Sequence, residues 1–210
     1  MLMRSFKEKA TTVLDYSDAT LQRLPCGLHR AKLTEASDLI PELSDLFASV
    51  PVNDPENWEI DLKIHMLMKG QFPCIPNWHC DNVPRDASGK LNYNFPTDYE
   101  EPPMLVWISG IPRTIFLAED YQTPFFPANH GELSEAVRSL QREGKVVFRE
   151  LPTQTWCNFT RHSPHTGQAA EGNCWRIFVR VTNRTLLSER PVISNIRRHS
   201  QVYLPNDFHW

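Results

Sequence analysis

Residues 58–67, Trp-Glu-Ile-Asp-Leu-Lys-Ile-His-Met-Leu, decide the fold class of this chain. From residue 60 to residue 66 every second side chain is apolar, and the positions between them carry Asp, Lys and His. This alternation has the two-residue period of a β-strand that turns one face toward a core. The stretch therefore predicts a half-buried strand.

Further extended stretches follow, each bounded by proline, glycine or polar turn residues. They span 74–81, 103–111, 113–118, 146–151, 154–162 and 174–182, with a short apolar piece at 202–204. Residues 86–101 are polar and turn-rich, which predicts a surface loop. Seventeen prolines in 210 residues also favour short strands and ordered loops over long helices. The chain is therefore predicted to be mainly β.

Two segments have the apolar period of a helix instead. In 34–50, Leu, Phe and Val side chains share one face, Ser37 or Asp38 is a plausible N-cap, and Pro41 falls in the first turn, where proline is tolerated. In 131–144, an apolar stripe ends at a glycine, a common helix stop.

These patterns divide the chain into three parts. We predict a helical, flanking N-terminal segment over 1–57 and a β core over 58–183. The core contains an inserted loop and helix at 119–145, and a C-terminal extension over 184–210 is expected to pack on it.

Composition excludes several classes of protein. Apolar residues make up 40% of the chain and charged residues 22%, which is too apolar for a disordered protein. No apolar run approaches the ~20 residues that a transmembrane helix needs, so no membrane partner is expected. The N-terminus lacks the apolar core of a secretory signal. Five cysteines without a C-x-x-C pair fit reduced thiols, so we expect a cytoplasmic location.

The charge distribution bears on nucleic acid as a partner. A net charge of −3 argues against a generic nucleic-acid binder, which relies on a positive surface. The excess of cations in 184–199 leaves a local basic patch open, although a solvated surface segment is the commoner meaning of such a run.

The first candidate for chemistry lies in residues 76–85, Pro-Asn-Trp-His-Cys-Asp-Asn-Val-Pro-Arg, where His79 precedes Asp81 by two positions. In a strand, residues i and i+2 project from the same face, so this imidazole and carboxylate can converge on one point. A histidine paired with an aspartate for structural reasons gives the same pattern, so the pair alone is a weak signal.

The second candidate lies in residues 160–180, which end one strand, cross a small-residue loop and begin another. His165 falls at the end of the first strand, and Arg176 falls near the start of the second, with ten residues between them. Such a loop can place both at the same end of a barrel. Arg176 occupies an inward position on an apolar strand, where an unpaired guanidinium is costly, so we expect an anionic partner. His162 competes with His165, because it shares a strand face with Thr160 and could also point inward.

The order of His-x-Asp, a distant His and then an Arg resembles the iron(II)/2-oxoglutarate-dependent dioxygenase superfamily. The resemblance covers about residues 60–182 and implies a double-stranded β-helix, or jelly-roll, barrel with flanking helices. It implies that His79, Asp81 and His165 bind Fe(II) and that Arg176 anchors 2-oxoglutarate. The spacing from His165 to Arg176 fits the family pattern, which favours His165 over His162 as the distal ligand.

The implied activity is hydroxylation of an organic substrate with O₂, which releases succinate and CO₂ from 2-oxoglutarate. The donor set suits it, because two imidazoles and one carboxylate on one face of Fe(II) leave open positions, and an arginine fork binds a carboxylate bidentately.

The substrate, a small molecule or a modified macromolecule, is not specified by the resemblance. Substrate contacts are expected from Trp78, Arg85 and Arg180. Two other functions remain open: a cupin-like metalloenzyme that does not use 2-oxoglutarate, and a catalytically inactive jelly-roll binding or regulatory protein.

Overall fold

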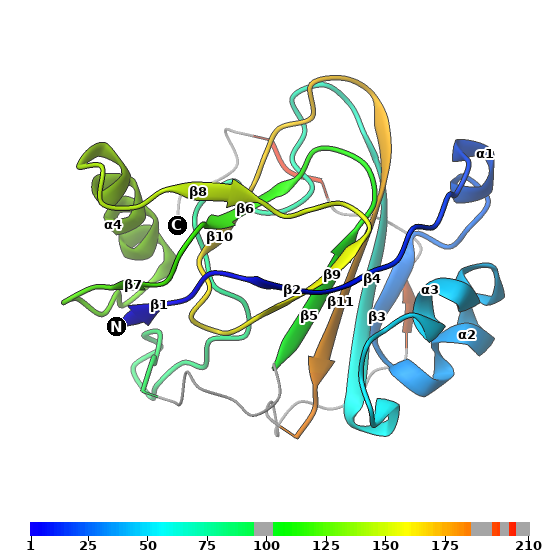
Figure 1. The fold of residues 1–210 in the computed structure, drawn as a ribbon, viewed down its shortest axis with the longest axis horizontal. Helices are drawn as coiled ribbons and strands as arrows, with labels where there is room; N and C mark the ends of the chain where they lie inside the picture. Colours follow the sequence, from blue (N-terminus) through cyan, green and yellow to red (C-terminus); the bar gives the residue numbers. More distant parts are fainter. Residues whose placement is uncertain (95–102, 186–194, 198–201, 205–210) are drawn as a thin grey trace.

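The computed structural model describes residues 1–94, 103–185, 195–197 and 202–204 (Figure 1). The regular secondary structure is mostly antiparallel β-sheet, with few helices. Seven strands form the largest sheet, in the order β12–β3–β4–β11–β5–β9–β2. Their bounds are β2 (Lys7–Thr11), β3 (Gly27–Lys32), β4 (Trp58–Leu67), β5 (Met104–Ile108), β9 (Thr155–Phe159), β11 (Cys174–Asn183) and β12 (Asn195–Arg197).

The strand predicted from residues 58–67 is confirmed as β4, which lies near the centre of this sheet. The prediction that only one face is buried was wrong, because Asp61 and His65 on the polar face are buried as well. It pairs with β11 along its whole length, from Trp58 opposite Asn183 to Leu67 opposite Cys174. Since β11 also pairs with β5, the three strands bring together segments that are far apart in the sequence. The predicted strands at 103–111, 154–162 and 174–182 are likewise confirmed, each within a few residues at its ends.

Two smaller antiparallel sheets complete the β structure. One has the order β10–β6–β8, formed by β10 (His165–Gly167), β6 (Thr114–Leu117) and β8 (Phe148–Glu150). The other pairs β1 (Leu2–Met3) with β7 (Tyr121–Gln122). The prediction of an extended strand over 74–81 was wrong: this segment contributes only an isolated bridge, between His79 and His165.

The predicted helix at 131–144 is confirmed as α4 (His130–Arg142). The Asn129 side chain caps it by accepting a hydrogen bond from the Glu132 backbone N–H at 2.9 Å. Leu133, Val137 and Leu140 are buried along one stripe, as the period predicts.

The prediction of one continuous helix over 34–50 was wrong. The segment forms two short α-helices, α2 (Ala36–Leu39) and α3 (Ser44–Ala48), with 3₁₀ turns at Leu33–Glu35 and Pro41–Leu43. Pro41 lacks a backbone N–H, and Ile40 before it has the extended dihedral φ −140°, so the helix is interrupted at this point. A third 3₁₀ turn, Pro55–Asn57, precedes β4.

The N-terminal segment is also less helical than the sequence indicates. Besides α1 (Asp18–Leu21), α2 and α3, it contributes β2 and β3 to the large sheet. Both strands are short, and β2 is largely exposed, so neither has a clear alternation of buried and exposed positions. Tertiary pairing therefore determines these strands more than local pattern does.

The large sheet has a different cover on each face (Figure 1). Helices α2 and α3 pack on one face through Ile40, Leu43, Leu46 and Phe47, which share one hydrophobic cluster with apolar side chains of β4 and β11. The other face turns toward the small sheet, and a core that includes Phe6, Val106, Phe116 and Phe159 fills part of the space between them. Helix α4 covers the far side of the small sheet through a separate cluster with Trp78 and Leu117.

Among the described residues, no helix has the length and apolar character required to cross a membrane. Most of the basic segment 184–199 and part of the predicted loop 86–101 lie outside the described residues.

Candidate metal centre

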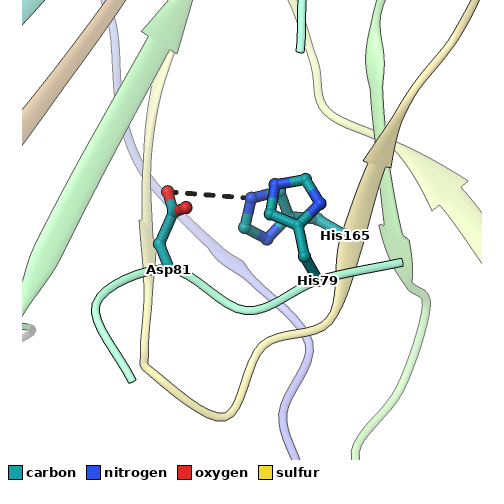
Figure 2. Close-up of side chains that lie close together, drawn as sticks. All are labelled: His79, Asp81 and His165. Carbon is teal, nitrogen blue, oxygen red and sulfur yellow. Dashed lines mark ion pairs between the residues drawn. The ribbon is translucent and has the colours of Figure 1, made fainter. Parts of the chain in front are cut away.

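The side chains of His79, Asp81 and His165 converge on one another (Figure 2). One potential ligand atom from each residue lies within 4.8 Å of those of the other two. His165 Nε2 is 3.7 Å from Asp81 Oδ2, and the two imidazole centroids are 4.4 Å apart. Both histidines are buried and Asp81 is half-buried. Two imidazoles and a carboxylate at this separation could hold a metal ion after a small inward movement, because metal–ligand bonds are about 2.0–2.2 Å long.

Backbone contacts bring the two histidines together from distant parts of the chain. His79 and His165 exchange two backbone hydrogen bonds, of 3.0 and 2.9 Å, so the irregular segment before Asp81 is fixed against β10. Gly167 permits a close approach here, since a Cβ at this position would lie 2.7 Å from Cys74 Sγ. Thus the segment carries Asp81 to the site although it is not a regular strand.

Each histidine ring is oriented through its Nδ1 atom. Nδ1 of His79 lies 2.8 Å from the backbone oxygen of Asn77, and Nδ1 of His165 lies 3.0 Å from that of Ser163. An Nδ1–H that donates to a carbonyl leaves Nε2 with its lone pair free, which is the tautomer a metal requires. Phe116 stacks on His165 with ring centroids 4.9 Å apart and further restrains it.

Burial and neighbouring charges set the protonation of the group. Burial, together with the nearby His165, lowers the pKa of His79 to about 3, so its imidazole is neutral at physiological pH. Burial alone would raise the pKa of Asp81, but the positive charge of Arg180 outweighs this and holds the pKa below its ordinary value. A neutral imidazole and an ionised carboxylate are the forms that bind metal.

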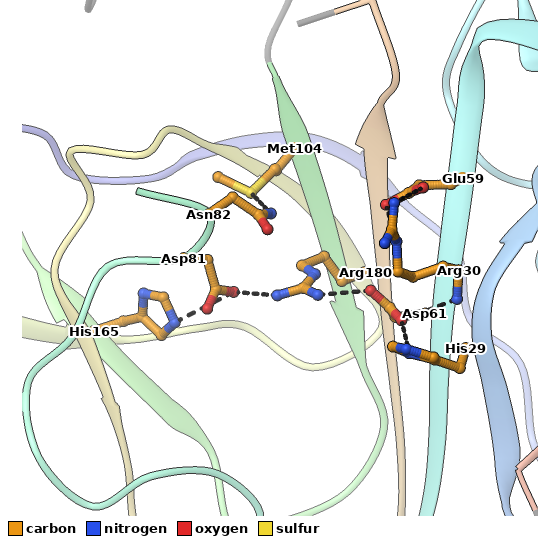
Figure 3. Close-up of polar contacts among 9 residues, drawn as sticks. All are labelled: His29, Arg30, Glu59, Asp61, Asp81, Asn82, Met104, His165 and Arg180. Carbon is orange, nitrogen blue, oxygen red and sulfur yellow. Dashed lines mark hydrogen bonds and ion pairs between the residues drawn. The ribbon is translucent and has the colours of Figure 1, made fainter. Parts of the chain in front are cut away.

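Arg180 links the half-buried Asp81 to a buried carboxylate, Asp61 (Figure 3). Its Nη1 donates to Asp81 Oδ2 at 2.7 Å, and its Nη2 donates to Asp61 Oδ2 at 2.6 Å. The other oxygen of Asp61 lies 3.2 Å from His29 Nδ1 and accepts the Arg30 backbone N–H at 3.1 Å. Arg180 therefore holds Asp81 in position through this hydrogen bond, as outer-shell partners of metal ligands do.

Arg176 lies on the same face of β11 as Arg180, and Phe178 lies between them on that face. It is 1% exposed, its Nε donates to the Pro112 backbone oxygen at 3.0 Å, and its Nη2 donates to Thr114 Oγ1 at 3.3 Å. Burial lowers its pKa to about 10, so it remains charged. No carboxylate of the described residues lies within ion-pairing distance of it, so this buried cation has polar partners but no counter-ion.

A cavity of about 430 Å³ opens beside the three converging residues. Two of the three predicted substrate contacts, Arg85 and Arg180, line it. The third, Trp78, does not: its ring packs on Phe148 at a centroid distance of 4.5 Å, within the cluster under α4. Thr114, the partner of Arg176, also lines the cavity.

His162 lies outside the candidate metal group. Its ring is buried and Nε2 lies 3.3 Å from the backbone oxygen of Tyr93, with the two rings 5.5 Å apart. The convergence of His165, and not His162, with His79 and Asp81 is the arrangement that the sequence spacing favours.

The cavity-lining side chains that sequence reasoning missed include His29, Asp61, Lys63 and His130. Asp61 and Lys63 lie in the alternation that predicts β4, where they served only as the polar positions of the strand pattern. Their signal was present, because polar residues opposite the polar positions of β11 form a shared face once the two strands pair. His29 and His130 have no recognisable spacing, in the sequence, to the His79-x-Asp81 motif or to His165.

No protein-family model matches the sequence, and no curated protein is significantly similar to it. The chemistry of the site is therefore inferred from its geometry.

Proposed function

We propose that this protein is an Fe(II)- and 2-oxoglutarate-dependent dioxygenase that hydroxylates an organic substrate. The observation that carries the proposal is the convergence of His79, Asp81 and His165 beside a cavity. This donor set, with both Nδ1 atoms engaged by backbone oxygens, fits a two-histidine, one-carboxylate iron site.

The arrangement of the strands supports a jelly-roll fold for this function. A central β4–β11–β5–β9 arrangement faces the small β10–β6–β8 sheet, to which the His79 segment adds by its bridge to His165. We propose that these two sheets are the halves of a double-stranded β-helix, a barrel whose rigid strands suit a metal site at one end.

Arg176 and Thr114 are proposed to bind the far carboxylate of 2-oxoglutarate. The guanidinium already donates to the Thr114 hydroxyl and lacks a counter-ion among the described residues. A buried arginine without an anion is costly, so a carboxylate ligand would complete its environment. Thr114 lines the cavity and could donate its hydroxyl proton to the same carboxylate.

When bound, iron, 2-oxoglutarate and O₂ would supply oxidative decarboxylation, which yields succinate, CO₂ and a hydroxylated product. The contribution of the chain is to hold the ligands, orient the co-substrate and limit water. Phe116 and Phe159 pack around His165, with Phe159 edge-on at 5.7 Å, and form an apolar wall on that side. Arg180 keeps Asp81 ionised and in place.

Anaerobic addition of Fe(II) and 2-oxoglutarate to the purified protein tests the proposal. We expect a weak visible charge-transfer band, and succinate formation once O₂ is admitted. Arg176→Met should weaken 2-oxoglutarate binding by about tenfold or more while Fe(II) affinity changes little, because a fork of charged donors is lost. Arg142→Met, at an exposed residue of α4, is the matched control and should behave as the wild type.

The same experiment separates the alternatives. A folded protein that binds Fe(II) but gives no band with 2-oxoglutarate would contradict the proposal and favour a cupin-like metalloenzyme. A folded protein that binds no metal would favour an inactive binding module.

A further inference from the structure

One cation in the cavity has no role in the proposed function. Lys63 lies on β4 opposite Phe178 of β11, and its Nζ is 5.9 Å from the Phe178 ring centroid. The side chain is half-buried and lines the cavity. Within the described part of the chain it makes no hydrogen bond and no ion pair.

The surroundings of Lys63 do not neutralise it. Burial lowers its pKa, and the positive charge of Arg180 lowers it further, whereas Cys74, Asp81 and Asp61 act in the opposite direction. Both of these carboxylates are already bound to Arg180 at 2.7 and 2.6 Å. An ammonium group held in a partly desolvated position without a partner is unfavourable unless a ligand supplies the anion.

In the proposed complex, the charge of Lys63 is not balanced by any other group that is counted. A divalent iron, Arg176 and Arg180 carry four positive charges, and Asp61, Asp81 and the two carboxylates of 2-oxoglutarate carry four negative ones. These charges balance. Lys63 and, nearer solvent, Arg85 remain as cavity-lining cations without a carboxylate partner among the described residues.

We infer that the substrate is an anion and that its carboxylate pairs with Lys63. This inference rests on the proposed function, because it assigns the two carboxylates of 2-oxoglutarate to iron and Arg176. One surplus, half-buried charge at Lys63 fits a singly charged group such as a carboxylate. The exposed guanidinium of Arg85, which donates to the Gly89 backbone oxygen at 2.6 Å, adds attraction at the edge of the cavity.

Matched pairs of ligands test this inference by binding and not by turnover. Phenylacetate and indole-3-acetate, each beside its primary amide, would be titrated calorimetrically into Mn(II)-loaded protein with saturating 2-oxoglutarate. In the wild type we expect each carboxylate to bind about tenfold or more tightly than its amide, since an ion pair in a desolvated site is lost with the amide. Lys63→Met should abolish this preference, and Lys63→Arg should retain it.

Lys7→Met, an exposed lysine on β2, is the control and should retain the preference. Affinity for 2-oxoglutarate should change by less than about twofold in Lys63→Met. Equal binding of acid and amide in the wild type, no binding of either acid, or an unchanged preference in Lys63→Met would overturn the inference. So would a loss of 2-oxoglutarate affinity in Lys63→Met, which would assign Lys63 to the co-substrate.

Failure of the proposed function has a different signature. If the wild type does not bind 2-oxoglutarate but prefers the carboxylates in a Lys63-dependent manner, the dioxygenase proposal fails and the anion site is supported.

Discussion

The two faces of the β4–β11 pair differ sharply although they belong to the same ten-residue strands. On one face, Leu62, Val179 and their neighbours pack under α2 and α3 in a fully apolar core. On the other, Asp61 and Arg176 are buried and Arg180 is half-buried, each with polar partners. The first face resembles the interior of any stable domain, and the second places charges where burial is expensive.

Within each of these strands, the apolar face contributes mainly to stability and the polar face mainly to ligand binding. Residues adjacent in sequence, such as Leu62 and Lys63, should respond to substitution in different ways. Changes on the apolar face should alter the free energy of unfolding without altering the site in molecules that remain folded. Changes on the polar face should alter ligand binding, and should alter stability only where they leave a charge unpaired.

Leu62→Ala is expected to have the largest effect on stability, a loss of about 4 kcal/mol, because it leaves a cavity in a site that is 0% exposed. Lys63→Met, one residue along, should cost less than about 1 kcal/mol. Urea unfolding of both metal-free variants measures the contrast. A larger loss for Lys63→Met than for Leu62→Ala would contradict the assignment of the two faces.

Arg180→Met should cost about 2 kcal/mol, because Asp81 and Asp61 lose their shared cation. The cost is below that of a fully buried pair, since Asp61 keeps its contacts with His29 and the Arg30 backbone and Asp81 is half-buried. Fe(II) affinity should also fall, by about tenfold, because the loss of an outer-shell partner of a metal ligand usually weakens metal binding. Equal Fe(II) affinity in the variant and the wild type would exclude a positioning role for Arg180.

Acid should remove a stabilisation of about 1–2 kcal/mol that depends on Asp61. Burial alone would raise the pKa of Asp61, but Arg180 and the hydrogen bonds to this carboxylate lower it below its ordinary value. A carboxyl whose pKa is lower in the folded state stabilises the protein fully above its unfolded pKa of about 3.9. This stabilisation is lost as the pH falls below that value and through the lower folded pKa. In metal-free protein, the stability difference between wild type and Asp61→Asn should therefore be larger at pH 7 than near pH 3. A difference that is constant with pH would show that the Asp61 carboxylate is not held ionised by its partners.

His162→Gln should have the smallest effect on the site, a change in Fe(II) affinity of less than about twofold. Its imidazole contacts the Tyr93 backbone oxygen and lies outside the metal group. His165→Gln, the matched change three residues along, should abolish binding. A result in the reverse order would make His162 the distal ligand.

The parts of the fold that the sequence predicted are those with a local signal. Alternation in β4 and the apolar stripe of α4 arise from residues close together in the chain, so both were identified with nearly correct bounds. β10, with three residues, and the largely exposed β2 have no such pattern, because only pairing with distant strands defines them. Pro41 was recognised, but its effect on a marginal helix was underestimated.

The candidate site also contains residues that the sequence could predict and residues that it could not. His79, Asp81 and His165 could be named from their types and order, since few combinations of residues suit one metal ion. The pairing of Arg180 with both Asp61 and Asp81 could not be named, because it depends on the register in which β11 lies against β4. Lys63 was missed for the same reason.

Anaerobic titration of Fe(II) into the wild type and into His79→Ala, Asp81→Ala and His165→Ala tests the central claim most directly. The three residues are predicted to hold a single ion, so the wild type should bind about one Fe(II) per chain and each folded variant should lose this binding. Retention of wild-type affinity by any of the three variants, with its fold verified by circular dichroism, would contradict the account.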